Sequence, residues 1–363
     1  MNSTQYALNE TETKDRPTHT LQRNAAPVAP TKETHMNAVV FHEYGSPDVL
    51  THERMPKPVP NDNEILVKVH ATSANAGDWH LMRGDPFLIR LGAGLRKPKS
   101  KFLGADVAGQ VEAVGSKVTQ FQPGDAVFGD LSRYGFGAFA EYVAAPEDAF
   151  VLKPTNQTFA QAAAVPEAAV TALQALRDHG QLQAGQKVLI NGASGGVGHF
   201  AVQIAKALGA EVTGVCSTRK MEMVRSIGAD HVIDYTQEDF TQNGQQYDLI
   251  LAVGGDLPIS AYRRALRPQG RYVMIGGSSM KQFFQAMLVG PWLSMTGKQK
   301  LGLMLVKPTQ ADLAFVAELL ETGKVVPVVD KTYPFSDLPD AIRYLEAGRA
   351  QGKVVITSLS SMV

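Results

Sequence analysis

The sequence lacks the features that mark several large classes of protein. Its 363 residues include one cysteine, Cys216, which excludes a disulfide within the chain and any metal site built from several thiolates. Lysine plus arginine equals aspartate plus glutamate, at 35 each, so the charge balance does not favour a nucleic-acid partner. The most apolar run, 283–293 (FFQAMLVGPWL), is too short to span a bilayer and is broken by Gly290-Pro291. What remains is a globular chain, 44% hydrophobic, with room for two domains.

Residues 1–35 differ in composition from the rest of the chain. They are rich in Thr, Asn, Gln and Pro and lack the apolar run of a secretory signal. Their acidic residues argue against a transit peptide. We therefore predict a flexible tail over 1–35, a fold that starts near Met36 and a cytoplasmic location, which the single cysteine suits.

Two patterns of secondary structure follow one another along the chain. From Met36 to about Val151, short Val- and Ala-rich segments separated by turn signals predict an antiparallel, barrel-like domain. An Ala- and Leu-rich helical segment follows over 159–178, which Pro166 must end or kink. Apolar strands then alternate with helices, which predicts a parallel sheet covered on both faces. We expect these strands at 187–191, 211–216, 231–234, 248–253, 271–275 and 303–306, and after them a helix over 311–322, a strand at 325–329, a helix over 338–347 and a strand at 353–357.

The most specific motif is a glycine-rich turn between a buried strand and a helix, VLINGASGGVGHFAVQIAKALGA. Gly195 lets the backbone approach a pyrophosphate, and Gly198 lets the helix pack closely on the strand. The helix N-terminus offers free amides and its positive dipole to the phosphates. A glycine-rich turn without a ligand is the alternative, but the strand–turn–helix context favours a dinucleotide. The residues expected to bind it are Ala193, Ser194, Gly195, Gly196, Val197 and Gly198.

The end of the next strand indicates which dinucleotide binds. A site for NAD places an Asp or Glu about 20 residues beyond the glycines, on the ribose 2′-hydroxyl. Here the chain reads VCSTRK over 215–220, without an acid. The hydroxyls of Ser217 and Thr218 and the charges of Arg219 and Lys220 suit a 2′-phosphate. Alternatively, the cations simply begin the next helix, but the pattern favours NADPH as the cofactor.

Together these motifs resemble the medium-chain dehydrogenase/reductase superfamily, and within it the zinc-free, quinone oxidoreductase-like branch. The similarity covers Met36 to Thr357 and includes SANAGDWHLMRGD, FLGADVAGQVEAVG, FQPGDAVFG, GAFAEYV, GADHVIDY and GKVVIT. It implies an α/β fold in which a Rossmann doubly wound parallel sheet is inserted in a GroES-like, mainly antiparallel β-barrel catalytic domain. The implied boundaries are 36–157 for the first catalytic part, 158–308 for the Rossmann domain and 309–363 for the return to the catalytic domain.

The resemblance also locates the positions at which zinc-dependent relatives bind their catalytic metal. These positions are Asn75, Ala105 and Glu167, and none is the expected thiolate or imidazole. We therefore expect no metal; an improvised site of His80 with Asp106 or Glu167 is the weaker alternative. By the same resemblance the cofactor is expected to contact Thr171, Tyr235, Val253, Gly254, Ile275, Gly276, Gly277 and Lys353, the last of which is a solvated surface cation in the alternative reading.

Without a metal, the favoured substrates delocalise their own charge after hydride addition, as quinones and α,β-unsaturated carbonyl compounds do. We expect Asn75 to donate its amide to the developing oxygen, Asp78 to orient this segment and His80 to relay a proton, although each has a purely structural alternative. Two other functions stay open: a zinc-independent, NADP-dependent alcohol or aldehyde dehydrogenase, and a non-catalytic NADPH-binding protein with a structural or regulatory role.

Segment 283–295 and the oligomeric state are the last open features. Its apolar side chains, with Lys281, Lys298 and Lys300 nearby, suit a membrane surface, but a buried wall of the substrate cleft or a subunit contact is favoured. The expected partner is a small-molecule substrate, without nucleic acid and without stable membrane insertion. The resemblance also implies a homodimer, which nothing in this chain proves.

Overall fold

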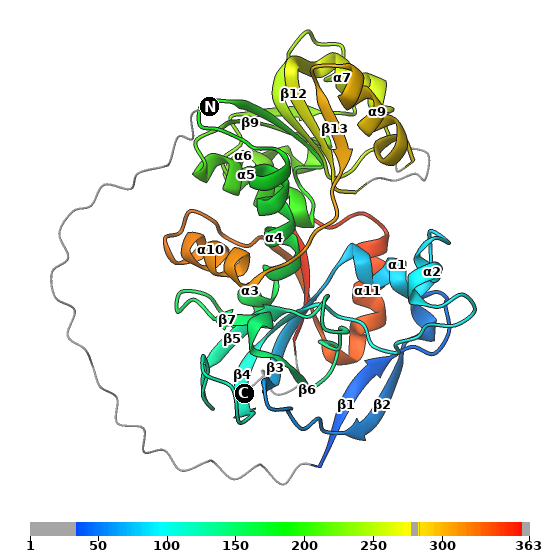
Figure 1. The fold of residues 1–363 in the computed structure, drawn as a ribbon, viewed down its shortest axis with the longest axis vertical. Coiled ribbons are helices and arrows are strands. Elements are labelled where there is room, and N and C mark those ends of the chain that lie inside the picture. The colour runs from blue at the N-terminus through cyan, green and yellow to red at the C-terminus, as the bar shows by residue number, and fades with distance from the viewer. Residues whose placement is uncertain (1–33, 277–281, 283, 358–363) are drawn as a thin grey trace, which may run out of the picture. The chain divides into compact units, whose positions relative to one another are not determined.

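The computed structural model describes residues 34–276, 282 and 284–357, and the tail expected at 1–35 lies almost entirely outside these ranges (Figure 1). Its described residues form a six-stranded sheet, a seven-stranded sheet and a two-stranded ribbon of β1 (His35–Val40) and β2 (Thr51–Pro56). The sequence therefore predicted the combination of a parallel sheet with a mainly antiparallel one correctly.

The six-stranded sheet is parallel throughout, in the order β10-β9-β8-β11-β12-β13. Its strands are β8 (Lys187–Asn191), β9 (Glu211–Cys216), β10 (His231–Asp234), β11 (Tyr247–Ala252), β12 (Leu266–Met274) and β13 (Lys300–Leu303). The order reverses between β8 and β11, and a ligand crevice is expected beyond the carboxyl ends of the strands at such a point.

Helices cover both faces of this sheet because its strands are apolar on both sides. Val188, Leu189 and Ile190 of β8 are all fully buried. Val188 and Ile190 belong to one core and Leu189 to the other, as the two-residue period of a strand requires. Figure 1 shows α5 (Gly196–Ala207) and α6 (Met221–Ser226) on one face and α7 (Ile259–Ala265) and α9 (Gly290–Thr296) on the other.

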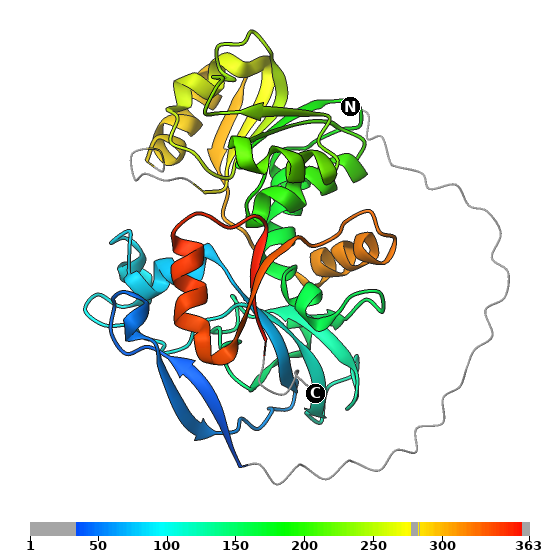
Figure 2. The same ribbon diagram turned by 180° about the vertical axis from the view of Figure 1, so that it is seen from behind.

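The seven-stranded sheet joins the two ends of the chain. Its strands are β3 (Glu64–Ala74), β4 (Asp106–Val114), β5 (Ala126–Asp130), β6 (Tyr142–Pro146), β7 (Phe150–Leu152), β14 (Val329–Pro334) and β15 (Lys353–Thr357). Strand β15 pairs antiparallel with β3, so that Val354 lies opposite Ala74 (Figure 2). On this pairing we propose that 36–157 and 309–363 form one domain around an inserted 158–308.

The remaining helices connect or cover these sheets. They are α1 (Ala76–Arg83), α2 (Ile89–Ala93), α3 (Phe159–Ala163), α4 (Pro166–Gln174), α10 (Gln310–Glu321) and α11 (Leu338–Glu346). Pro166 divides the segment expected to be helical over 159–178: it occupies the first turn of α4, where its missing N–H has no helical partner to lose. In the described ranges, no helix combines the length and the apolar character needed to cross a membrane.

Two strand predictions were wrong in position. The last strand of the parallel sheet is β13, at Lys300–Leu303 rather than 303–306, because Leu301 pairs with Tyr272 while Leu305 is exposed. The strand expected at 325–329 begins only at Val329. The backbone N–H of Val326 instead donates to the side chain of Gln203, which replaces a partner strand at this point.

Candidate functional site

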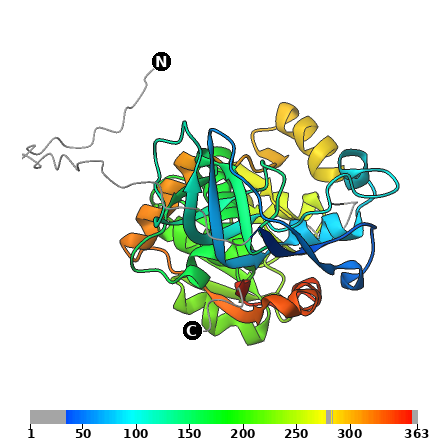
Figure 3. The ribbon, with the colours of Figure 1, turned by 90° about the horizontal axis from the view of Figure 1, so that it is seen from below.

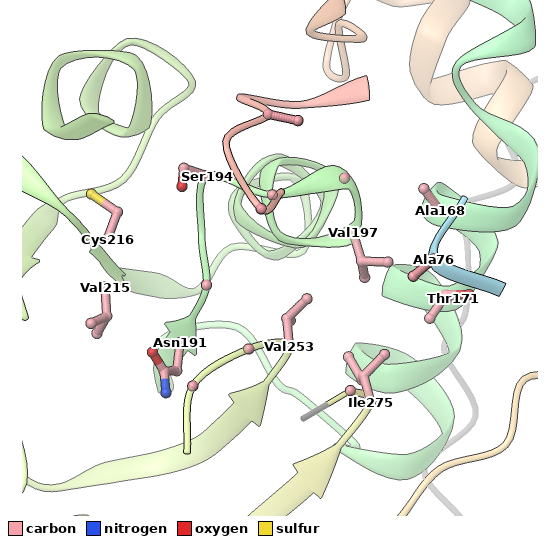
Figure 4. A pocket seen from close by; sticks show the side chains of 18 of the residues that line it. Ala76, Ala168, Thr171, Asn191, Ser194, Val197, Val215, Cys216, Val253 and Ile275 are labelled. Carbon is pink, nitrogen blue, oxygen red and sulfur yellow. The ribbon is translucent and has the colours of Figure 1, made fainter. Parts of the chain in front are cut away.

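A cavity of about 1050 Å³ lies beyond the carboxyl ends of the parallel strands. Figure 4 shows Asn191, Ser194, Val215 and Cys216 toward one end and Ala76, Ala168 and Thr171 toward the other. Most of the residues expected to bind cofactor or substrate line this cavity: Asn75, His80, Thr171, Ser194, Gly195, Gly196, Val197, Ser217, Tyr235, Val253, Gly254, Ile275, Gly276 and Lys353. The structure thus brings these scattered positions to one site.

The other predicted residues lie behind the cavity wall or outside the description. Ala193, Gly198, Thr218 and Arg219 do not line the cavity, and neither does Asp78. Gly277 lies outside the described residues. Of these residues, Thr218 and Arg219 directly follow Ser217, which lines the cavity.

The glycine-rich turn has the geometry that a dinucleotide phosphate requires. A Cβ atom on Gly198 would lie 2.1 Å from the carbonyl oxygen of Gly192, so a side chain at this position would drive α5 away from the turn. A Cβ on Gly195 would meet nothing nearer than 3.5 Å, because the space in front of it belongs to the cavity. Helix α5 begins directly after Gly195 and points its first amides toward this space. The turn fits a pyrophosphate.

The end of β9 carries cations but no free hydroxyl from Thr218. The Thr218 Oγ1 donates to Asp234 Oδ2 at 2.5 Å, and this bond is the main cause that holds the pKa of Asp234 below its usual value. Arg219 is exposed. Lys220, the other cation expected to suit a 2′-phosphate, is buried against the cavity and donates from Nζ to the carbonyl oxygen of Ala350 at 2.8 Å. Arg219 is therefore the better candidate to meet a 2′-phosphate.

A buried polar cluster occupies the opposite end of the cavity, centred on the carboxylate of Asp106. Asp106 is fully buried, and its Oδ2 accepts from Ser73 Oγ at 2.6 Å, from Asn75 Nδ2 at 2.8 Å and from Lys353 Nζ at 3.1 Å. Its Oδ1 accepts from the backbone N–H of Glu167 at 2.7 Å. Four hydrogen-bond donors therefore converge on this buried carboxyl group.

Lys353 links the two ends of the cavity, which corrects the reading of it as a solvated surface cation. Its side chain is 2% exposed. Its Cδ would lie 3.3 Å from a Cβ on Gly196, so the stem passes beside the phosphate turn. Its Nζ then donates to Asn75 Oδ1 as well as to Asp106. A fixed positive charge thus lies beneath the amide that was expected to face the substrate.

Asp78 lies behind this cluster and shapes the segment that carries Asn75. Its Oδ2 accepts from the backbone N–H of Asn75 at 2.8 Å, and its Oδ1 from that of Gly104 at 2.9 Å. Burial raises the pKa of Asp78 to about 7 despite these two bonds. These contacts are those of a positioning residue.

Glu167 faces the cavity from the first turn of α4, one helical turn before Thr171. Burial, and then the charges of Asp106 and Asp78, raise its pKa well above the usual value of a glutamate. This shift favours the protonated form of the carboxyl group, which faces the cavity.

His80 also lines the cavity, but its ring is held by local contacts. Its Nδ1 bonds the carbonyl oxygen of Asp85 at 2.7 Å, and the ring stacks on Trp79 with centroids 3.6 Å apart. With Nδ1 donating to a carbonyl, the neutral tautomer leaves Nε2 as an acceptor. The structure therefore leaves one nitrogen of His80 for a proton relay.

Comparison with known proteins now adds to this geometry. Residues 61–155 match the family model of the alcohol dehydrogenase GroES-like domain, and residues 227–356 match that of a zinc-binding dehydrogenase. The chain is 36% identical over 334 residues to the chloroplast envelope quinone oxidoreductase homolog of Arabidopsis thaliana, covering 88% of this chain and 98% of that protein. It is 34% identical over 370 residues to human mitochondrial NAD(P)H oxidoreductase RTN4IP1, covering 90% of each.

The solved structures agree with these relatives. The quinone oxidoreductase from Coxiella burnetii superposes with a TM-score of 0.79 at 30% identity, covering 89% of this chain and 99% of that one. The CurK enoyl reductase superposes with a TM-score of 0.77 at 26% identity, covering 90% and 100%. The chain belongs to the medium-chain dehydrogenase/reductase superfamily. Its fold is a GroES-like domain with a Rossmann domain, and it is an oxidoreductase that uses a nicotinamide cofactor.

The positions expected to correspond to zinc ligands can now be described in the structure. Of the three positions that the resemblance assigned to zinc ligands, Asn75 is bonded to Lys353 and Asp106. Within the described residues, no group of three or more His, Cys, Asp or Glu side chains is arranged to hold a metal ion. An ammonium group, which repels a metal cation, lies against the first of these positions.

The comparisons leave two predictions as they were. The relatives named above are described as chloroplast and mitochondrial proteins, so a cytoplasmic location for this chain stays a prediction. A homodimer stays a prediction as well.

Sequence reasoning missed the centre of the polar cluster. Asp106 was considered only as an improvised metal ligand, and Ser73 had no assigned role. The signal was present in FLGADVAG, where a charged residue stands in an otherwise apolar strand, because a buried charge needs partners elsewhere in the chain.

Proposed function

We propose that the protein transfers a hydride from NADPH to a quinone or an α,β-unsaturated carbonyl compound without zinc. The observation that carries this proposal is the cluster of Lys353, Asn75 and Asp106 at the substrate end of a cavity whose other end fits a dinucleotide. When bound, the cofactor supplies the hydride. The protein's own residues bind the cofactor, orient the acceptor and stabilise the negative charge that develops on the acceptor's oxygen.

Asn75 is the proposed donor to that oxygen. Its Oδ1 accepts from Lys353, which fixes the orientation of the amide, and its Nδ2 donates one hydrogen to Asp106. The nitrogen has a second hydrogen, and Asn75 lines the cavity. A preorganised donor of this kind, with an ammonium group behind it, stabilises an enolate or phenolate oxygen without a Lewis acid.

Glu167 is the proposed proton donor for enone substrates. Hydride addition to the β-carbon leaves an enolate, and the reaction is completed when the α-carbon takes a proton and the carbonyl re-forms. Burial raises the pKa of Glu167, which favours its protonated form, and the residue faces the cavity beside Thr171. A quinone depends less on a proton donor from the protein, because its reduced oxygen takes a proton from water rapidly.

The choice of NADPH rests on the end of β9, where Ser217 lines the cavity and Arg219 is exposed beside it. No acid stands at the position that would bind a ribose 2′-hydroxyl in a site for NAD. The acids Glu238 and Asp239 also line the cavity, so we expect a preference for NADPH of about tenfold to hundredfold rather than an absolute one.

The deciding experiment is a substrate panel of quinones, enones and aldehydes with NADPH and NADH in parallel, before and after metal chelation. We expect turnover of quinones and enones that survives chelation, a saturated ketone as the enone product, and a large primary isotope effect with 4-deuterated NADPH. An alcohol as the enone product would favour the dehydrogenase alternative. Activity that required added zinc would overturn the proposal, and tight cofactor binding without oxidation would favour the non-catalytic alternative.

Two variants test the proposed roles at the substrate end. Asn75→Ala is expected to lower kcat about a hundredfold for both substrate classes. Glu167→Gln is expected to lower kcat about a hundredfold for enones but only a few-fold for quinones. In deuterated water, the wild type would place deuterium on one face of the α-carbon and Glu167→Gln on both faces. An equal loss for both substrate classes with intact stereochemistry would remove Glu167 as the proton donor.

A further inference from the structure

The helices around the parallel sheet differ in their relation to the cavity. The described residues of 284–295, which include α9, do not line it, so the expectation that this segment forms a buried cleft wall is not met by them. Figure 3 shows α9 at the edge of the view, and a subunit contact through it stays a prediction. Helix α5 instead begins at the cavity and runs into the core, where its buried residues include a histidine, His199.

The ring of His199 makes one hydrogen bond to a described residue. The side chain is fully buried, and its Nδ1 lies 3.0 Å from the carbonyl oxygen of Gly195. Its Nε2 has no hydrogen-bond partner among the residues that the structure describes. Because a carbonyl oxygen can only accept, Nδ1 carries the proton and donates. Burial lowers the pKa of His199 to about 4, so the ring is neutral near pH 7.

A histidine with an unpaired nitrogen is an unfavourable choice for filling the core. An apolar side chain of the same shape would pack here without leaving a polar atom unsatisfied. The ring also does not line the cavity, so it does not meet a phosphate directly. What distinguishes His199 from an apolar residue at this position is therefore its bond to the glycine-rich turn.

This bond acts on the peptide group that joins Gly195 to Gly196. Gly195 is the N-cap residue of α5, and its carbonyl oxygen also accepts the backbone N–H of His199 at 3.1 Å. A trans peptide group is planar, so its C=O and N–H point in opposite directions. With the carbonyl held along the helix, the N–H of Gly196 points out of the first turn, toward the cavity that Gly196 lines. The two flanking residues are glycines, which restrict rotation of this peptide group the least.

We propose that His199 is a positioning residue for the dinucleotide. Its ring holds the Gly195 carbonyl, prevents rotation of the Gly195–Gly196 peptide group and so keeps the Gly196 amide aimed at the pyrophosphate. A donor that is fixed in advance binds its ligand more tightly, because the turn need not be ordered on binding. The inference rests on a nicotinamide dinucleotide at this turn; it does not depend on the acceptor or on the preference for NADPH.

Gln203 provides a comparison one helical turn further along the same face of α5. It is buried as well, but its side chain bonds the backbone of Val326, with Nε2 donating to the carbonyl oxygen at 3.0 Å and Oε1 accepting from the N–H at 2.8 Å. These two bonds join α5 to the segment before β14 rather than to the glycine-rich turn. Removing the Gln203 amide is therefore expected to lower stability, whereas removing the His199 donor is expected to lower cofactor affinity.

The test measures NADPH binding by isothermal titration calorimetry, and Tm, for the full chain and its variants. His199→Phe keeps a buried ring without the donor, and we expect about tenfold weaker binding with an unchanged or higher Tm. His199→Leu, which is smaller, replaces it if the phenylalanine variant does not fold. His199→Asn keeps a donor as many bonds from Cα as Nδ1 of histidine, and should bind within about threefold of the wild type. Gln203→Leu should lower Tm and leave the affinity within about twofold.

Two further readouts separate positioning from other causes of weaker binding. The ratio of the wild-type affinity to that of His199→Phe is expected to be the same at pH 6 and pH 8, because the ring is neutral at both. An imidazolium that attracted the phosphates would make this ratio fall as the pH rises. The second readout is 2′-phospho-ADP-ribose, which has the pyrophosphate of NADPH without its nicotinamide and should lose affinity by the same factor.

Several outcomes would overturn the proposal. They are equal affinity of His199→Phe and the wild type, a loss that His199→Asn shares in full, a ratio that falls with pH, and a loss for NADPH that 2′-phospho-ADP-ribose does not share. Binding of NADH in place of NADPH would contradict only the proposed preference, and the same comparison would then use NADH and ADP-ribose. Intact cofactor binding without reduction of any quinone or enone would contradict the proposed function and leave the role of His199 standing.

Discussion

The two ends of the cavity are built in different ways. The dinucleotide end is made largely of backbone: a turn from Gly192 to Gly198 and the first amides of α5, all within one short stretch of chain. The substrate end is made of side chains from four segments, and its central contact joins residues 278 positions apart, Asn75 and Lys353. At the first end a side chain on Gly198 would clash with the backbone, whereas the second end depends on the pairing of Lys353 with Asp106. Each end can therefore be broken without breaking the other.

The largest effect is expected at the dinucleotide end from Gly198→Val. The new Cβ would lie 2.1 Å from a backbone oxygen, and backbone cannot move aside cheaply, so we expect loss of the folded protein or of all measurable NADPH binding. Gly195→Ala is the matched control, since its Cβ has 3.5 Å of room. It should melt like the wild type and yet bind NADPH about tenfold or more weakly by fluorescence titration, because the methyl group enters the phosphate space. Equal behaviour of the two variants would contradict this account of the turn.

Lys353→Met is expected to disrupt the polar cluster at the substrate end. It removes the cation bonded to the buried Asp106, which is expected to destabilise the protein by about 3–5 kcal/mol in urea unfolding. It should also lower kcat at least about a hundredfold. Adding Asp106→Asn should recover most of the stability and none of the activity. If Lys353→Met lowered the affinity for NADPH by as large a factor as kcat, the independence of the two ends would be contradicted.

A smaller effect is expected from Arg219→Ala, which tests whether the exposed cation meets the 2′-phosphate. KM for NADPH should rise about tenfold to hundredfold while KM for NADH stays unchanged. Steady-state kinetics with both cofactors measures this. The nearby Arg225→Ala is the control for a general loss of positive charge, and an equal rise in KM for both cofactors would rule out the assigned role.

The smallest effect concerns pH and the carboxyl group of Asp78. Its pKa is about 7 in the folded protein against 3.8 in the unfolded chain, so between these values the folded state holds a proton that the unfolded state has released. Stability from this group is therefore lost as the pH rises through that window. We expect Tm to fall by a few degrees from pH 5 to pH 8, and Asp78→Asn to flatten this fall. Asp62→Asn, at an exposed acid whose pKa is lowered, should not flatten it.

The same contrast explains what could be predicted from sequence. Strands β8, β9 and β10 were predicted with their observed bounds, because a continuous apolar run between turn residues is a local signal. The placement of β13 and β14 was wrong, because it depends on which neighbouring strand or side chain takes up the backbone hydrogen bonds. Lys353 could be placed near the cofactor only by resemblance. Its pairing with Asn75 is a tertiary contact that no local pattern encodes.

The pairing of β15 with β3 has a consequence for biosynthesis. The strands of the parallel sheet and its glycine-rich turn are all made before α10, whereas Lys353 follows only with β15. Until β15 is made, Asp106 lacks its lysine partner. The substrate end is therefore assembled later in synthesis than the dinucleotide end.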